Sequence, residues 1–297
     1  MKYMNMKRYR NILAMTAIAV MAGLLSVSCS SDNANEEKVA EAKSPLKINV
    51  AGVATTKSFF EGNQLPDECV YYISIFNDGI DYNSYDIPVE YVKGNNTISR
   101  QVFITRESVV GAVYCDRGKV IVDGGVIVLN AADQEDVLVA YSDVYPNRPE
   151  VSLMFQHIMS RVTLRITKSA DNNRTYDNFG TAEVSGVASG YYHLFYDQVE
   201  TTDNKTALKV EPKDKGYIET ATDVVEYDFL VLPQSSDMKM NISCSSLKTT
   251  IYFSSSTFKA GKKYVYDAVI KGNNLEIQSV SVEPWDSENH DISIEVK

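Results

Sequence analysis

The chain lacks the residue patterns on which most enzymes and metal sites depend. It has three histidines among 297 residues, none of them in an HExxH sequence, and it contains no GxSxG or Walker loop. Beyond residue 28, no apolar run reaches the roughly 20 residues that a transmembrane helix needs. We therefore predict no catalytic residues, no metal ligands and no cofactor.

Basic charge is also scarce after the first 28 residues. This leading segment holds four Lys and Arg residues and no Asp or Glu, so its removal changes the formal net charge from −10 to −14. Proteins that bind nucleic acid usually carry basic stripes. We expect no nucleic-acid partner.

Cysteine is too sparse for a disulfide framework. After Cys29 the chain keeps only Cys69, Cys115 and Cys244, whose spacing fits neither a zinc site nor a CxxC pair. An odd number of cysteines cannot all pair within one chain. A Cys69–Cys115 disulfide is compatible with the sequence, but unpaired thiols buried on strands fit it better.

The first 28 residues have the order of a secretory signal peptide. A basic head is followed by an apolar run from Ile12 to Val27 and by the small residue Ser28. The adjoining Cys29 resembles the lipobox of bacterial lipoproteins, in which this cysteine is acylated and becomes the mature N-terminus. We predict a lipoprotein signal peptide over residues 1–28 and an outer-membrane lipid anchor on Cys29. A plain cleaved signal and an uncleaved anchor are the alternatives.

Residues 29–45 are small, polar and acidic, as in Ser30-Ser-Asp-Asn-Ala-Asn-Glu-Glu37. This composition predicts a flexible tether between the lipid and the first domain. The acidic patch resembles the surface-export signals of Bacteroidetes lipoproteins, and a solvated linker is the alternative.

From Leu46 onward the pattern is that of β-strands. Leu46, Ile48 and Val50 alternate with polar residues. Residues 120–129 predict a hairpin with an Asp-Gly-Gly turn, and residues 264–277 predict another that turns on Lys-Gly-Asn-Asn. We predict an all-β protein of two tandem antiparallel β-sandwich domains, 46–148 and 149–297, with Tyr145–Pro149 as the linker.

Two features of the second predicted domain invite a functional interpretation. His157 and Ser160 lie close together in sequence, but their strand pattern predicts packing rather than a nucleophile and base. Tyr191, Tyr192 and Phe195 form an aromatic cluster that could contact a sugar or a protein, although strands favour tyrosine in any case.

Five segments in order resemble the fimbrillin family of Bacteroidetes, the pilins of type V pili. The first two are the Cys29 lipobox, with the strand at 46–50 and the segment 54–62 behind it, and the pair of strands at 126–131 and 137–142. The other three are Phe155-Gln-His-Ile-Met-Ser-Arg161, Phe229-Leu-Val-Leu-Pro-Gln234, and Ala260-Gly-Lys-Lys-Tyr-Val-Tyr-Asp267 leading to Pro284-Trp285. The resemblance spans the chain after the signal peptide.

This resemblance implies two transthyretin-like sandwiches and a lipidated precursor. It also implies that a protease cuts after a basic residue, typically arginine, and frees the first strand, after which a neighbouring subunit's strand fills the groove. No arginine lies between Arg10 and Arg100, and the matching position holds Lys57. We expect cleavage between Lys57 and Ser58 and displacement of the strand that carries Leu46, Ile48 and Val50.

The C-terminal tail repeats the pattern of the strand expected to leave. Ile292, Ile294 and Val296 have the same spacing as Leu46, Ile48 and Val50. Because side chains alternate along a strand, either triplet could line the same groove. We predict that residues 291–297 are a donor strand for the next subunit. The alternative is an ordinary last strand of their own domain.

We therefore predict a structural subunit or accessory adhesin of a cell-surface fimbria, assembled by strand exchange, with no enzymatic activity. Its expected partners are other fimbrial subunits, the outer-membrane lipid at Cys29, and a host or bacterial surface ligand. The alternative is a solitary outer-membrane surface lipoprotein that binds a glycan or a protein and never polymerises.

Overall fold

In the residues that the structure describes, the regular structure is β-strand throughout, apart from one short 3-10 turn, η1 (Ala131–Asp133). The all-β prediction is therefore confirmed. Within the part of the chain that the structure describes, no helix is long and apolar enough to cross a membrane. The computed structural model describes residues 45–50, 53–54, 65–77, 84–115, 122–123, 125–194, 198–213, 216–233, 238–253, 258–285 and 293–295.

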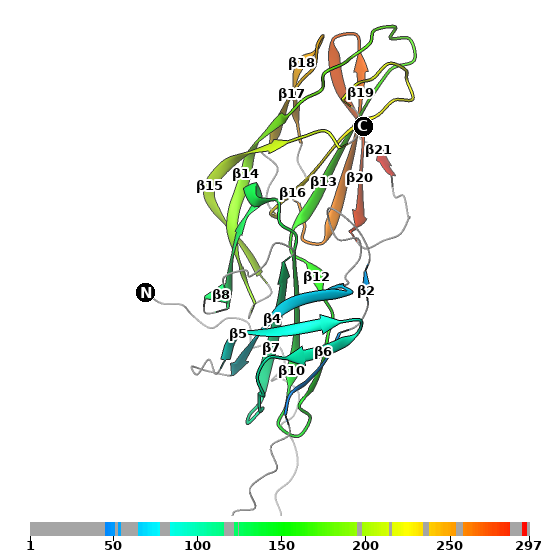
Figure 1. The fold of residues 1–297 in the computed structure, drawn as a ribbon. Coiled ribbons are helices and arrows are strands. Elements are labelled where there is room, and N and C mark those ends of the chain that lie inside the picture. The colour runs from blue at the N-terminus through cyan, green and yellow to red at the C-terminus, as the bar shows by residue number, and fades with distance from the viewer. Residues whose placement is uncertain are drawn as a thin grey trace, which may run out of the picture. The chain divides into compact units, whose positions relative to one another are not determined.

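The first sheet is antiparallel and has six strands in the order β12-β10-β7-β4-β5-β6 (Figure 1). Branched and aromatic residues are dense in its central strands, where they fit a pleated, buried surface. Its members are β4 (Glu68–Asn77), β5 (Ser84–Val92), β6 (Asn95–Ile98), β7 (Ser108–Cys115), β10 (Val137–Val144) and β12 (Gln156–His157).

The second sheet has the order β16-β13-β19-β20-β21. Its β13 and β19 run parallel, with Arg161 opposite Lys263 and Lys168 opposite Ile270. Parallel neighbours need a long connection, and here five other strands lie between them in sequence. The members are β13 (Ser160–Lys168), β16 (Val225–Val231), β19 (Lys262–Lys271), β20 (Asn274–Pro284) and β21 (Ser293–Glu295).

The third sheet has the order β18-β17-β14-β9-β8, and β15 also pairs with β14. Gly190 in β14 lies so close to β15 that an added Cβ would be 2.3 Å from the Glu200 carbonyl oxygen, so only glycine fits there without movement. The members are β8 (Val122–Asp123), β9 (Val126–Asn130), β14 (Ala182–His193), β15 (Gln198–Val210), β17 (Lys239–Ser243) and β18 (Lys248–Tyr252).

This third sheet crosses the boundary predicted between residues 148 and 149. Strands β8 and β9 precede that boundary, yet β9 pairs with β14, as in the pair Val128 and Tyr191. Alternation in a sequence identifies strands but does not identify their partners, which is why the crossing was not foreseen. The division into two independently folding domains stays a prediction.

Two small parallel sheets complete the described strands. Strand β1 (Lys47–Val50) pairs with β11 (Glu150–Leu153), and β2 (Val53–Ala54) pairs with β3 (Leu65–Pro66). The prediction of antiparallel sandwiches did not include these parallel pairs. Strands β1 and β11 lie at opposite ends of a segment of about 100 residues, as the Asn49–Glu150 separation of 101 shows.

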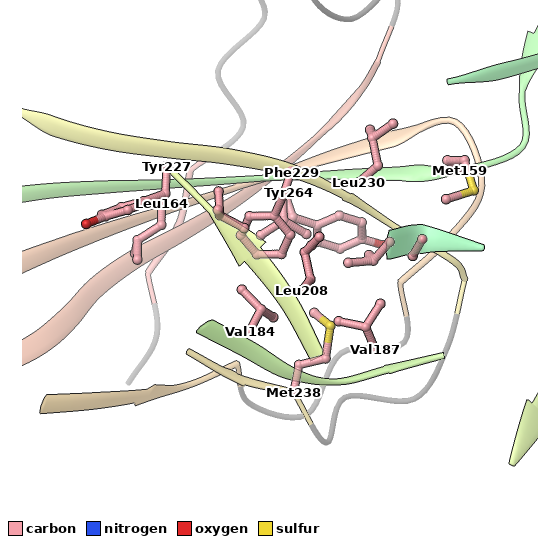
Figure 2. Packing of buried hydrophobic residues seen from close by; sticks show 14 of the residues in the cluster. Met159, Leu164, Val184, Val187, Leu208, Tyr227, Phe229, Leu230, Met238 and Tyr264 are labelled. Carbon is pink, nitrogen blue, oxygen red and sulfur yellow. The ribbon is translucent and has the colours of Figure 1, made fainter. Parts of the chain in front are cut away.

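Buried apolar side chains form two clusters. The first core draws on β1, β4, β5, β7, β10 and β11, and includes Leu46, Tyr71 and Phe155. The second core lies between the second and third sheets. Figure 2 shows Val184 and Leu208 of the third sheet pointing toward Leu164 and Phe229 of the second sheet.

Strands β7 and β10 contribute to both cores because successive side chains point to opposite faces. Tyr114 and Leu138 belong to the first core, whereas Val113 and Val139 belong to the second. The first sheet is thus buried on both faces in this region.

The predicted turns are present where their residues are described. Strands β8 and β9 form the hairpin with Gly125 at φ 78°, and β19 and β20 form the hairpin with Gly272 at φ 62°. The predicted linker is a tight turn, because the Arg148 N–H donates to the Tyr145 carbonyl at 3.0 Å.

Candidate functional site

Strand β1, the strand predicted to be displaced, lies against the first core. Leu46 and Ile48 are only 5% and 7% exposed, and Val50 is partly buried against the same cluster. Lys47 and Asn49, between them, are exposed. The alternation predicted from the sequence is confirmed.

One edge of β1 is held by a backbone ladder to β11. The pairing is parallel, with Lys47 opposite Glu150 and Val50 opposite Leu153, and the Lys47 N–H donates to the Pro149 carbonyl at 2.8 Å. Outside the ladder, Asn49 Nδ2 donates to Glu150 Oε1 at 2.7 Å.

The opposite edge, which we call the far edge, is held differently. The Leu46 N–H donates to the Val102 carbonyl at 2.8 Å, and the Ile48 carbonyl accepts from Asn96 Nδ2 at 3.1 Å. Asn96 lies on β6, the edge strand of the first sheet. A side-chain amide therefore binds the far edge at Ile48, where a strand would otherwise do so.

Tyr71 fixes the orientation of the Asn96 amide through a hydrogen bond. Its hydroxyl donates to Asn96 Oδ1 at 2.8 Å, and its ring packs edge-on against Phe155 with centroids 5.5 Å apart. Burial raises the pKa of Tyr71 far above its usual value, so the hydroxyl stays protonated and remains a donor.

These contacts set the free-energy cost of removing β1. Full burial of a Leu or Ile side chain contributes about 1.5–3 kcal/mol, so Leu46 and Ile48 together contribute roughly 3–6 kcal/mol. The four-residue ladder adds net hydrogen-bond energy of about 0.5–1.5 kcal/mol per bond. An equally apolar strand could replace both contributions.

The predicted donor strand lies at a sheet edge. Residues Ser293–Glu295 form β21, which pairs with β20 over three residues, from Ser279 opposite Glu295 to Ser281 opposite Ser293. It lies at one end of the second sheet, and β16 lies at the other. Ile292 and Val296 lie outside the described residues.

The predicted processing sites also lie outside the described residues. This holds for the lipidation site Cys29 and for both residues of the predicted cleavage site, Lys57 and Ser58.

Cys69 and Cys115 are not joined by a disulfide. They contact different cores, Cys69 the first and Cys115 the second, so their side chains lie on opposite faces of the first sheet. The Cys115 thiol donates to Glu135 at 3.4 Å, and burial raises the pKa of the Cys69 thiol to about 12. Both unpaired thiols lie on strands, as the favoured alternative predicted, but only Cys115 is buried, whereas Cys69 is partly buried.

His157 and Ser160 have packing roles, as predicted. The buried His157 ring stacks on the Trp285 indole with centroids 4.0 Å apart, and its Nδ1 lies 3.0 Å from Asp136 Oδ1. Ser160 Oγ donates to the Lys259 carbonyl at 2.8 Å. Among the described residues, no three His, Cys, Asp or Glu side chains are grouped as a metal site.

Two polar contacts were missed by the sequence analysis. Arg161 and Asp228 form a buried ion pair with three hydrogen bonds of 2.6–3.1 Å. The amide of Gln134 bonds both backbone groups of Leu230, at 2.8 and 2.9 Å, and so covers the edge of β16. No local pattern marks either contact.

Comparison with known proteins identifies the family. The model of the fimbrillin-like family matches residues 112–285, which is more than half of the chain. The chain belongs to the fimbrillin-like family. The resemblance inferred from five short segments is thereby confirmed. No curated protein sequence matches this fimbrillin-like chain significantly.

Solved structures of low sequence identity share the fold. A proposed cell adhesion protein from Bacteroides uniformis superposes with a TM-score of 0.60 at 18% identity, covering 83% of this chain and 99% of that one. A second from Bacteroides ovatus gives 0.59 at 14%, covering 84% and 100%. A fimbrial protein from Bacteroides vulgatus gives 0.53 at 12%, covering 81% and 99%.

Family membership supports a fimbrial role, a place at the cell surface and interaction with other fimbrial subunits. It also favours a structural role over an enzymatic one.

Proposed function

We propose that this protein is a subunit or accessory adhesin of a fimbria that assembles by strand exchange from a lipidated precursor. The observation that carries the proposal is the setting of β1. Its apolar face fills the first core, while a strand ladder among the described residues binds only one of its edges. The tail offers the same apolar spacing, which suits it to replace β1 in another copy.

A solitary surface lipoprotein is the second candidate. One observation favours a ligand contact outside the groove. Val128 is 61% exposed on β9 and lies directly opposite Tyr191, which is 39% exposed on β14. An aromatic residue beside an exposed aliphatic one suits a sugar or a protein surface.

Mapping the N-terminus of the protein in native fimbriae distinguishes the two candidates. We expect the polymerised form to begin at Ser58, because cleavage after Lys57 separates β1 from the rest of the chain and lets a donor strand displace it. Mass spectrometry of purified fimbriae, with the membrane fraction as the precursor control, measures this. Fimbriae whose subunits retain Leu46 would argue against exchange at this groove, and a protein found only as uncut monomers would favour the solitary lipoprotein.

Replacing Cys29 with serine should prevent lipidation and release the protein from membranes. The expectation rests on the lipobox-like junction at Ser28 and Cys29, and on the fact that acyl chains hold a protein to a bilayer in proportion to their buried CH₂ groups. Metabolic labelling with a fatty acid and cell fractionation measure the result. Cys69→Ser is the matched control and should keep its label. Persistent labelling of the Cys29 variant would contradict the assignment.

A further inference from the structure

The hydrogen bonds at the far edge of β1 constrain how any strand can occupy the groove. In a parallel pair, the backbone groups of alternate residues face the same edge. The Lys47 N–H faces β11, whereas the Leu46 N–H and the Ile48 carbonyl face Val102 and Asn96. A strand in the groove must therefore present a carbonyl to Asn96 from the residue whose side chain enters the core.

The Asn96 amide has a fixed orientation. The Tyr71 hydroxyl donates to its Oδ1 at 2.8 Å, and this leaves Nδ2 as the group that faces the strand at 3.1 Å. Tyr71 is fully buried, and its hydroxyl holds the amide in this orientation while β1 occupies the groove. The amide can serve any occupant that places a carbonyl there.

We propose that Asn96 is an anchor of this groove, a fixed hydrogen-bond donor that any strand in the groove must meet with a main-chain carbonyl. The next step rests on the proposed function. The tail of a second copy enters the groove parallel to β11, with Ile294 in the position of Ile48. A slip of one residue would place Ser293 or Glu295 in the core, so the apolar triplet fixes this register. A slip of two residues would keep a carbonyl there but leave one of the three apolar positions empty.

This register has an electrostatic consequence at Glu150. Glu295 of the incoming tail would occupy the position of Asn49, whose side chain now donates to Glu150 at 2.7 Å. Two carboxylates would then replace a hydrogen bond. The protein's own strand is the better partner of Glu150, which disfavours exchange before cleavage.

The test uses the full mature chain with a site-specific protease sequence inserted after Lys57. After cutting, β1 stays bound without a covalent link, and labelled peptides of residues 44–52 or 289–297 can replace it. Fluorescence anisotropy gives the affinity of each peptide. We expect Asn96→Asp to weaken both peptides about tenfold, because the carboxylate repels the strand carbonyl and cannot donate to it. Asn95→Asp, at the exposed neighbouring position, is the matched control and should change affinity less than about twofold.

Two further variants test the orientation of the amide and the effect of charge. Tyr71→Phe keeps the buried ring and removes the hydroxyl, so we expect about threefold weaker binding of both peptides. This variant tests the anchoring role of the amide independently if Asn96→Asp folds poorly. Glu150→Gln should strengthen the tail peptide by about two- to fivefold and should not strengthen the peptide of residues 44–52. Thermal unfolding of each uncut variant checks its fold.

The outcomes separate this inference from the proposed function. If Asn96→Asp and Asn95→Asp behave alike with the peptide of residues 44–52, Asn96 does not anchor the strand, whatever the tail does. If that peptide depends on Asn96 but the tail peptide does not bind, the role of Asn96 holds for β1 and the tail is not the donor. A tail peptide that is indifferent to Glu150→Gln overturns the parallel register.

Discussion

Replacing Asp228 with alanine should lower the free energy of unfolding by about 3–5 kcal/mol, the range for removing one partner of a buried ion pair. Asp228 and Arg161 are 6% and 7% exposed, and the carboxylate also accepts from Thr163 Oγ1 at 3.1 Å. Without it, the guanidinium keeps its charge in a site that water hardly reaches. Urea unfolding of the mature chain measures the change.

Glu226→Ala is the control for Asp228→Ala. Glu226 lies two residues earlier on β16 and pairs with Arg165 and Lys213, which are 45% and 44% exposed. Exposed pairs contribute about 0–1 kcal/mol, so we expect little change. Removing Arg161 together with Asp228 should recover part of the loss. Equal effects of Asp228→Ala and Glu226→Ala would show that burial does not govern this ion pair.

Deleting residues 291–297 should abolish assembly while leaving a folded, lipidated precursor. The described part of this segment is a three-residue edge strand, so its removal leaves the ladder between β19 and β20 intact. If the tail is the donor strand, the truncated subunit can accept a neighbour but cannot join the next one. SDS-resistant ladders and electron microscopy of cells that express only the variant measure this.

Point substitutions in the tail separate the donor role from a general need for the segment. The double variant Ile292→Asp and Ile294→Asp should block assembly as the deletion does, because the groove holds apolar side chains. Ala at positions 293 and 295, on the alternate face of the strand, should preserve it. Normal ladders from the deletion or from the 292/294 variant would return residues 291–297 to the role of an ordinary last strand.

The sequence predicted features whose causes are local. The alternation at Leu46, Ile48 and Val50 located β1, and turn residues located both hairpins. The partner of each strand depends on residues far away, and so the pairing of β9 with β14 could not be read from periodicity.

The side chains that bind edge strands were also missed. Gln134 contacts Leu230 across 96 residues, and Asn96 contacts Ile48 across 48. An asparagine in a Lys-Gly-Asn-Asn turn predicts the turn, and nothing nearby predicts that its amide binds another strand. In the groove, the sequence thus identified the apolar strand but not the polar group at its far edge.

The parallel pairing of β1 with β11 has a consequence for the order of folding. The contact closes a segment of about 100 residues, as the Asn49–Glu150 separation of 101 shows, and the entropy cost of closing a segment grows with its length. The ladder formed by that closure spans four residue pairs. Strand β1 should therefore dock after the folding transition state, with φ-values near zero. Substitutions at Leu46 or Ile48 would then speed unfolding and leave the folding rate almost unchanged.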